Sequence, residues 1–533
     1  MRATVAPSGA ASASRLRPSD IPRMAVFHGW TQNSTVELDG RQIPAAEGEL
    51  RWPPPAAATV KLGILETVVT PAEVSKIRSL VADAEFDTDG DSVDGIASHE
   101  MFVFQKSGGK RNEAGQIDHD PAGFAARQPL RDALSAVMDP ILHDRIDPYV
   151  RRRFPAQCGA DAPPERACTP CSSLVRRYRP GERRSHNPHR DMLALVTVVV
   201  SLADYGTEYR GGLYVSAGQG RQVVALNRGD AVVHQSDLLH GVDLGDEASE
   251  RWSWILWYYD STRCVSRGHE WSKAAAEAGD AMHQHMCACA LPIAAQFSAI
   301  LGDTPQFCAN RSRRIRHLRY GFRLRLDASL SQEAIAHGRQ LWMRRAADAG
   351  FAESQVAVGR LEQGGGNLAA AEGWFRKAAA AGDADASYCL AQLAVRNATW
   401  AAGASAAQSA PVAAAVRHLE DAARHIYTGP NTLGGAPFAT YALGIAHLYG
   451  YGDLERDAAR ALEWFEFSGI PEGFMAVAVG LEASGRAADA ARWRARAKLI
   501  GFGSGWLRDS RRATPLQLHL WPTTGSRGGP PYW

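Results

Sequence analysis

The chain has 533 residues, which is too many for one hydrophobic core and indicates two to four domains. An apolar content of 45% and a charged content of 22% are those of an ordinary soluble protein. The formal net charge of +2 excludes a general electrostatic preference for nucleic acid or anionic membranes. The eight cysteines are too few for a disulfide scaffold, and the longest apolar run, 193–203, is too short to span a bilayer.

Residues 1–58 are rich in Ala, Pro and Gly, which predicts a disordered leader. Residues 1–19 carry arginine, serine and alanine but no acidic residue, as organelle transit peptides do. A disordered Ala/Ser tail accounts for the same composition. The compartment therefore stays open: a cytoplasmic location is favoured, and organelle targeting by this leader is the alternative.

The next elements are helical. After a short strand at 62–69, Thr70 and Glu73 flank Pro71 in the pattern of a capping box, and the apolar spacing continues a helix to residue 84. A second helical stretch covers about 130–150 and contains two prolines. Cys168 and Cys171 form a lone CxxC pair, which we interpret as ordinary loop thiols, with a redox pair or half of a zinc site as alternatives.

From residue 173 the pattern changes to short strands. The run 192–202 is almost continuously apolar and rich in valine, as in a strand buried on both faces. Further apolar stretches at 213–215, 222–226, 231–234 and 252–259 are separated by turn residues. Many short strands at close spacing predict a β-sandwich or jelly roll.

A metal-binding pattern lies within these strands. His189 and Asp191 are two residues apart, so a strand or its end can direct both side chains to one side. His240 follows on a later strand, and Arg251 begins an aromatic one. Two imidazoles and one carboxylate are the ligands of the facial triad that holds non-haem Fe(II), and an arginine nearby suits a dianionic co-substrate.

This segment resembles the prolyl 4-hydroxylase-type branch of the Fe(II)/2-oxoglutarate dioxygenases. The resemblance covers about 173–263, with a weaker lead-in from Leu62, and rests on these motifs: Tyr178-Arg-Pro-Gly181, His189-Arg-Asp191, Gly211-Gly212-Leu213, Gly229-Asp230, His240-Gly-Val and Arg251-Trp-Ser-Trp-Ile-Leu-Trp257. It implies a mainly-β double-stranded β-helix, or jelly roll, with N-terminal supporting helices. It also implies Fe(II), 2-oxoglutarate as co-substrate, O2 and ascorbate as cofactors.

Carried over by position, His189, Asp191 and His240 are the iron ligands, and Arg251 binds the distal carboxylate of 2-oxoglutarate. Tyr178 falls where the family has a pocket tyrosine, and a core tyrosine is the alternative.

Thr197 lies on the strand after the triad, within reach of the same co-substrate carboxylate. His186 is a rival metal ligand that we expect instead in the pocket. His234 stands where the family usually has an aromatic or apolar residue.

The C-terminal half is Ala-rich and repetitive. Residues 342–350 match residues 374–382 at an offset of 32, and an earlier copy stands at 271–279. Such a period predicts an α-solenoid of helical hairpins whose tryptophans and tyrosines belong to the core. The repeats resemble Sel1-like repeats, relatives of the tetratricopeptide type, which implies a protein partner rather than catalysis.

The resulting division is a leader at 1–58, a dioxygenase domain at 59–263, a helical linker with an Arg-rich insertion at 264–330, a Sel1-like repeat solenoid at 331–505 and a flexible tail at 506–533. The leading hypothesis is hydroxylation of a peptidyl proline with decarboxylation of 2-oxoglutarate to succinate. The alternatives are hydroxylation of another residue or a small molecule, or a catalytically dead adaptor acting through the repeats. No specific nucleic acid and no membrane span are expected. We interpret the Arg-rich stretch 311–325 as a solvated insertion, with binding of an acidic partner or RNA as the alternative.

Overall fold

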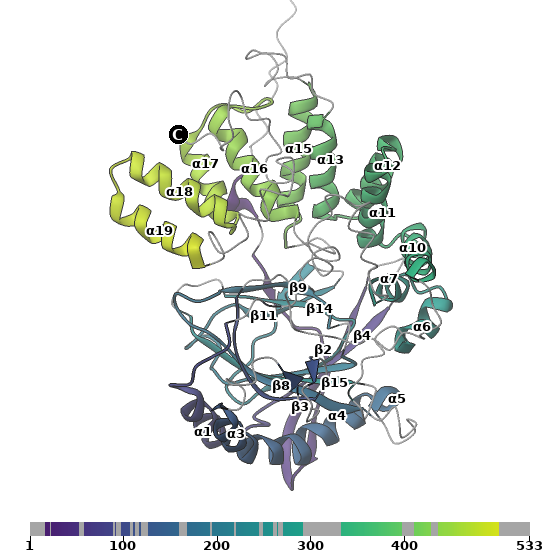
Figure 1. Cartoon of the computed structure of the whole chain (residues 1–533), viewed down its shortest axis with the longest axis vertical. Coiled ribbons are helices and arrows are strands. Elements are labelled where there is room, and N and C mark those ends of the chain that lie inside the picture. The colour runs from purple at the N-terminus through teal and green to yellow at the C-terminus, as the bar shows by residue number, and fades with distance from the viewer. Residues whose placement is uncertain are drawn as a thin grey trace, which may run out of the picture.

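The computed structural model places two sheets in the N-terminal part of the chain and a run of helices in the C-terminal part (Figure 1). It describes residues 16–499 apart from 22, 53–57, 89–90, 92–96, 107–109, 112–116, 119–125, 159–167, 192–193, 218–219, 245–248, 260–263, 265–269, 291–331, 397–409 and 428–434. The Arg-rich stretch 311–325 and the tail 506–533 lie outside the described residues. Among the described helices, none is both long and apolar enough to cross a membrane.

The two sheets form the predicted jelly roll. The larger sheet is antiparallel, in the order β2 (Trp30–Leu38), β3 (Arg41–Arg51), β4 (Thr59–Leu65), β13 (Ala231–Gln235), β10 (Val196–Ser201), β15 (Arg251–Tyr259), β8 (Thr169–Tyr178) and β5 (His99–Gln105). The smaller sheet has the order β1 (Ala25–Val26), β12 (Gly220–Val223), β11 (Gly212–Ala217), β14 (Leu239–Asp243) and β9 (Ser185–His189). A separate hairpin pairs β6 (Lys110–Arg111) with β7 (Ile117–Asp118).

Helices cover the outer face of the larger sheet, and Figure 1 shows α1 and α3 on the side of that sheet away from β9, β11 and β14. These helices are α1 (Pro71–Val81), α3 (Gln128–Ile141), the π-helical turn η2 (Leu142–Ile146), α4 (Asp147–Arg153) and the short α5 (Pro155–Cys158). The capping box at Thr70 is confirmed, because its hydroxyl accepts from the Glu73 amide while the Glu73 carboxylate accepts from the Thr70 amide. The helical stretch continues through Pro140 and the π-helical turn into α4, which begins at Asp147 and has Pro148 in its first turn.

Strand alternation sorts the side chains of the larger sheet onto two faces. In β10, Val196, Val198 and Val200 pack in one core cluster with the helices, whereas Val199 belongs to a second cluster between the sheets. Thr197 alternates with them and therefore shares the inner face with Val199. Both faces of β10 are buried, which explains the nearly continuous apolar run seen in the sequence.

The predicted disordered leader is wrong for residues 30–51. This segment forms β2 and β3, which extend the larger sheet from β4. The side chains Val36, Leu38, Ile43 and Ala45, which face the helices, are buried in the same core cluster as those helices. Only a few positions in each of these two strands are buried. The strand pattern is therefore weak in the sequence, and the high content of Ala, Pro and Gly in 1–58 obscures it.

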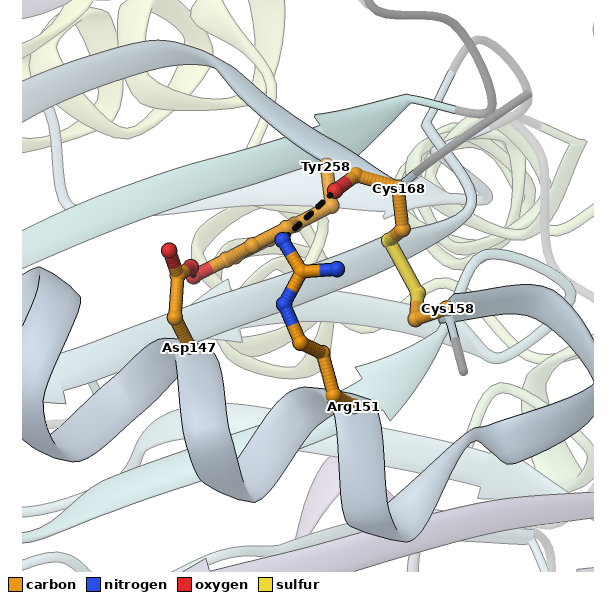
Figure 2. Close-up of a disulfide and its surroundings, with 5 residues drawn as sticks. All are labelled: Asp147, Arg151, Cys158, Cys168 and Tyr258. Atoms are coloured by element: carbon orange, nitrogen blue, oxygen red, sulfur yellow. Dashed lines mark hydrogen bonds between the residues drawn. A yellow bond between two sulfur atoms is a disulfide. The ribbon is translucent and has the colours of Figure 1, made fainter. Parts of the chain in front are cut away.

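The interpretation of the CxxC pair as loop thiols is also wrong. The structure joins Cys158 to Cys168, and Cys171 to Cys264, so each member of the motif pairs with a distant partner. The first disulfide ties α5 to the start of β8, beside Arg151, which donates to the Cys168 carbonyl (Figure 2). Disulfides persist in oxidising compartments and are rare in the cytosol. This pairing therefore counts against the cytoplasmic location that the sequence favours.

The C-terminal helices stack as hairpins, as predicted. They are α6 (Glu270–Glu277), α7 (Ala281–Ala290), α10 (Gln332–Asp348), α11 (Ala352–Gly364), α12 (Leu368–Ala380), α13 (Ala384–Arg396), α15 (Ala410–Arg424), α16 (Gly435–Tyr449), α17 (Ala458–Phe467), α18 (Pro471–Ala483) and α19 (Ala487–Leu499). The glycine that ends each repeat match has positive φ, 93° at Gly350 and 82° at Gly382, as the left-handed end of a helix requires. Trp374 and Trp464 are buried, which confirms their role in the core.

The helical region is packed onto the β region. Met282 and Met286 of α7, Ala346 of α10 and Phe351 share one core cluster with side chains of the β-strands. Within the helical linker that the sequence predicts for 264–330, α7 is therefore packed against the β region, and residues 265–269 and 291–330 lie outside the described part of the chain. A second contact joins the two regions: the backbone amide of Arg221 in β12 donates to the backbone carbonyl of Tyr427, which follows α15.

We predict that the two disulfides stabilise the fold unequally. The Cys171–Cys264 link spans 93 residues and the Cys158–Cys168 link spans 10, and the entropy removed from the unfolded chain grows with the length of the closed loop. Replacing both cysteines of the longer link with serine should lower the free energy of unfolding by about 2 kcal/mol more than the same change at the shorter link. Chemical unfolding of the two double variants measures this difference. Equal losses would contradict the prediction.

Candidate metal centre

Two neighbouring strands of the smaller sheet carry the predicted histidines. His189 ends β9 and pairs in register with His240 of β14, so the two side chains are direct cross-strand neighbours with ring centroids 4.4 Å apart. Asp191 follows directly after the strand. Its Oδ1 lies 3.5 Å from Nε2 of His189, and its Oδ2 lies 3.6 Å from Nε2 of His240. One ligand atom from each of the three residues falls within 4.8 Å of the others.

Hydrogen bonds to the backbone orient both imidazoles. Nδ1 of His189 lies 2.8 Å from the Asn187 carbonyl oxygen, and Nδ1 of His240 lies 3.1 Å from the Leu238 carbonyl oxygen. A carbonyl only accepts, so each ring carries its proton on Nδ1 when neutral. The lone pairs on the two Nε2 atoms then face Asp191. Metal-binding histidines usually have this arrangement, in which the second ring nitrogen donates to a backbone carbonyl.

The Thr197 hydroxyl contacts the carboxylate of Asp191, the candidate metal ligand. From the sequence we expect it to contact the co-substrate. Its hydroxyl donates to Oδ2 of Asp191 at 2.6 Å, from the inner face of β10. The sequence predicts that this hydroxyl binds 2-oxoglutarate, and the structure gives it this different partner. The hydrogen bond holds the aspartate in one rotamer, which leaves Oδ1 and the remaining lone pairs available to a cation.

The charges of the three residues suit a divalent cation. Burial lowers the pKa of His240 well below its ordinary value, which keeps this imidazole neutral. Burial raises the pKa of Asp191, but the charges of His240 and His189 and the hydrogen bond with His189 outweigh it and hold that pKa well below its ordinary range. For His189 burial lowers the pKa, yet the hydrogen bond with Asp191 and its charge raise it overall. A proton on His189 is therefore the main competitor for a metal ion.

Arg251 lies on the inner face of the jelly roll. It is 1% exposed, and no described carboxylate forms an ion pair with it. Its Nη1 donates weakly to the Ser253 hydroxyl at 3.4 Å, and its Nε has no hydrogen-bond partner among the described residues. Its guanidinium lies 5.8 Å from the ring of Tyr178 and 5.9 Å from that of Tyr209. A buried guanidinium without a counter-charge is costly, so this position is suited to an anionic ligand.

The predicted tyrosine and glycines lie beside this arginine. Tyr178 is 1% exposed and pairs with Arg251 across β8 and β15. Gly212 has φ of 99°, and a Cβ there would lie 2.8 Å from the Tyr209 ring. The glycine therefore lets β11 approach Tyr209. Sequence reasoning missed Tyr209, whose only signal is its place just before Gly211 and Gly212.

The two other histidines flank the triad without joining it. Nε2 of His186 lies 3.0 Å from Oδ2 of Asp91, and burial lowers the pKa of His186 to about 4. The rival ligand is thus engaged by another carboxylate, as expected for a pocket residue. His234 is fully buried, its ring lies 4.6 Å from that of His240, and its Nε2 has no hydrogen-bond partner among the described residues.

The residues present fit a ferrous ion and a 2-oxo acid. The donor set of two neutral imidazole nitrogens and one ionised carboxylate is that of non-haem iron sites with open positions, and no thiolate takes part. The buried Arg251, which has no carboxylate partner among the described residues, supplies the positive charge that a distal carboxylate would need. The two histidines and Arg251 belong to strands whose inner faces meet between the two sheets.

No family model matches the chain, and no curated protein matches it. Similar solved structures include a 2OG-Fe(II) oxygenase family oxidoreductase from Burkholderia pseudomallei, at 19% identity over 39% of this chain and 88% of that one, with a TM-score of 0.26. A prolyl-4-hydroxylase from Pseudomonas putida is 16% identical over 37% of this chain and 91% of that one, with a TM-score of 0.23. A Sel1 repeat protein from Oxalobacter formigenes is 17% identical over 44% of this chain and 82% of that one, with a TM-score of 0.28.

We predict that metal binding strengthens as the pH rises through the pKa of His189, which lies above its ordinary value of 6.5. A ligand imidazole must be neutral, so below that pH each bound ion displaces about one proton, and above it none. Calorimetric titration with Co(II) in buffers of different ionisation enthalpy measures the proton release. An affinity that does not change with pH across this range would contradict the charge state assigned to His189.

Proposed function

We propose that the chain is an iron- and 2-oxoglutarate-dependent dioxygenase that hydroxylates a substrate. The observation that carries this proposal is the convergence of His189, Asp191 and His240 within 4.8 Å, in a jelly roll whose inner face also carries Arg251. In this proposal the first three side chains hold Fe(II), and Arg251 holds 2-oxoglutarate by its distal carboxylate. Ascorbate remains an expectation from the sequence resemblance alone.

Iron and 2-oxoglutarate, when bound, would supply the oxidising chemistry, with loss of CO2 to give succinate and transfer of one oxygen atom of O2 to a substrate C–H bond. The chain's own residues bind, orient and shield. Thr197 holds the carboxylate of Asp191, and the backbone carbonyls of Asn187 and Leu238 hold the two imidazoles. Arg251 can present two parallel N–H donors to a carboxylate, flanked by the rings of Tyr178 and Tyr209. The burial of these groups keeps bulk water away from the carboxylate they would bind.

The substrate we propose is a peptidyl proline. The support is the sequence resemblance to the prolyl 4-hydroxylase-type branch, together with a helical region built as stacked hairpins of the kind that binds proteins. The repeats would recruit the protein that carries the proline. The same triad serves hydroxylation of other residues and of small molecules, since the choice of substrate depends on the loops around the site.

We predict that Fe(II) and 2-oxoglutarate together give a weak visible charge-transfer band in the absence of O2. The band arises only when the 2-oxo acid chelates a ligated ferrous ion, so it reports both groups at once. His240→Ala should abolish it because one ligand is lost. His143→Ala, which changes a 60% exposed histidine on η2, is the matched control and should leave it unchanged. A wild-type protein without the band would instead support an adaptor that acts only through its repeats.

The same band tests the arginine. Arg251→Ala should raise the 2-oxoglutarate concentration needed for half of the signal by at least about tenfold, since a hydrogen bond to a charged group contributes about 1.5–3 kcal/mol. Arg210→Ala removes an exposed arginine close to Gly211 and is the control. An unchanged requirement in Arg251→Ala would contradict the role assigned to this residue.

We predict that a peptide library incubated with the protein, Fe(II), 2-oxoglutarate and O2 gains one oxygen atom on proline. Tandem mass spectrometry locates the oxygen, and His240→Ala provides the background because it lacks a metal ligand. Oxygen found on another residue type, with none on proline, would contradict the substrate proposal while leaving the dioxygenase proposal in place.

A further inference from the structure

Arg190, the residue between His189 and Asp191, contacts the helical region. Its guanidinium makes a two-pronged ion pair with Glu353 of α11. Nη1 donates to Oε2 at 2.9 Å, and Nη2 donates to Oε1 at 2.8 Å. The side chains are only 6% and 4% exposed. This contact therefore joins the candidate metal centre directly to a helix more than 160 positions further along the chain.

Aromatic rings and a histidine surround the ion pair. The Arg190 guanidinium lies 5.0 Å from the Trp52 ring and 5.9 Å from the Phe351 ring, and these two rings are 6.3 Å apart. Glu353 also interacts with Nε2 of His285 on α7 at 3.0 Å. Burial raises the pKa of Glu353, but the charges and hydrogen bonds of Arg190 and His285 outweigh it, so the carboxylate stays ionised.

Arg190 also touches the segment that carries the second histidine. Its Nε donates to the Asp237 carbonyl at 3.3 Å, and the adjacent carbonyl, that of Leu238, is the one that orients His240. One guanidinium therefore contacts both of the segments that supply metal-site residues. The position of this guanidinium is set from the other side by Glu353.

We propose that Glu353 is a positioning residue of the metal centre, which acts through Arg190, and that the helical region is thereby a structural part of the oxygenase. The inference rests on the proposed function, because it assumes that His189, Asp191 and His240 bind a metal ion. It assigns the repeats a second role besides recruitment of a partner. Without the carboxylate, Arg190 would be a buried charge lacking its partner and would shift toward water. The two ligand segments would then lose their common tether.

Metal binding by the full-length chain tests the proposal. Co(II) is the probe, since its visible spectrum reports the geometry of the ligands and its titration gives an affinity without any turnover. Glu353→Gln keeps the shape of the side chain and removes the charge. Loss of a hydrogen bond made directly to a metal ligand typically costs 10- to 100-fold in metal affinity. Glu353 acts one residue further out, through Arg190, so we expect Co(II) binding to weaken by about tenfold, the lower end of that range, with an altered spectrum.

Glu362→Gln is the matched control. Glu362 lies on the same helix and forms an ion pair with Arg344 at 3.1 Å, but the side chains of Arg344 and Glu362 are 50% and 27% exposed, far more than those of Arg190 and Glu353. Exposed pairs contribute little to stability, so this variant should bind Co(II) as the wild type does. Circular dichroism of each variant shows whether the helices are intact.

A double-mutant cycle separates positioning from general stability. If Glu353 acts through Arg190, Glu353→Gln should have no further effect on Co(II) affinity in a chain that already carries Arg190→Gln. The double variant removes both charges of the pair, so neither is left buried without its partner. Its Co(II) affinity can therefore be measured even if Glu353→Gln alone unfolds the chain. Full Co(II) affinity in folded Glu353→Gln, or in the double variant, would overturn the inference. So would an undiminished effect of Glu353→Gln in the Arg190→Gln background.

The two proposals fail in different ways. A folded wild-type chain that binds no Co(II) contradicts the proposed function and, with it, the role of Glu353. If the wild-type chain binds Co(II) and Glu353→Gln binds it with the same affinity and spectrum, only the positioning role of Glu353 is contradicted, and the proposed function stands.

Discussion

The antiparallel register of β9 and β14 is the constraint on which the site depends. It sets His189 directly opposite His240, and Asp191 then needs only the two residues after His189 to reach both rings. A shift of one residue would turn one histidine to the other face of the sheet, because side chains alternate along a strand. The apolar inner faces of the neighbouring strands hold the register by burying their side chains between the two sheets.

The electrostatics of the interior divide its ionisable groups into two kinds. Arg190 has a described carboxylate partner in Glu353, and His186 has one in Asp91. Arg251 has none among the described residues, although it is as deeply buried as any of them. Burying an unpaired charge costs several kcal/mol, which a protein tolerates where a ligand of opposite charge completes the site. The distribution of partners thus distinguishes Arg251 from the ion-paired Arg190, in line with the role in anion binding that we propose for Arg251.

Much of the fold and site could be predicted from the sequence because the signals are local or periodic. The nearly continuous apolar run 192–202 and the repeat match between 342–350 and 374–382 predict the sheets and the stacked hairpins, and the structure confirms both. The spacing of His189, Asp191 and His240 predicts that their side chains lie close together, and in the structure one ligand atom from each lies within 4.8 Å of the others.

What could not be predicted depends on contacts between distant segments. The strands β2 and β3 are stabilised by burial against α1 and α3, and a composition rich in Ala and Pro does not reveal this. The partners of Cys168 and Cys171 lie 10 and 93 residues away, and spacing alone does not identify them. Glu353 is an ordinary helical glutamate in the sequence, and only the packing of α11 against the β region brings it to Arg190.

X-ray absorption spectroscopy of the Fe(II)-loaded protein, prepared without O2, tests the central claim most directly. The account predicts a first shell of nitrogen and oxygen only, with the outer-ring scattering of two imidazoles, and with one imidazole after His240→Ala. Sulfur in the first shell, or an imidazole count that does not change in that variant, would contradict the assignment of His189, Asp191 and His240 as the metal ligands.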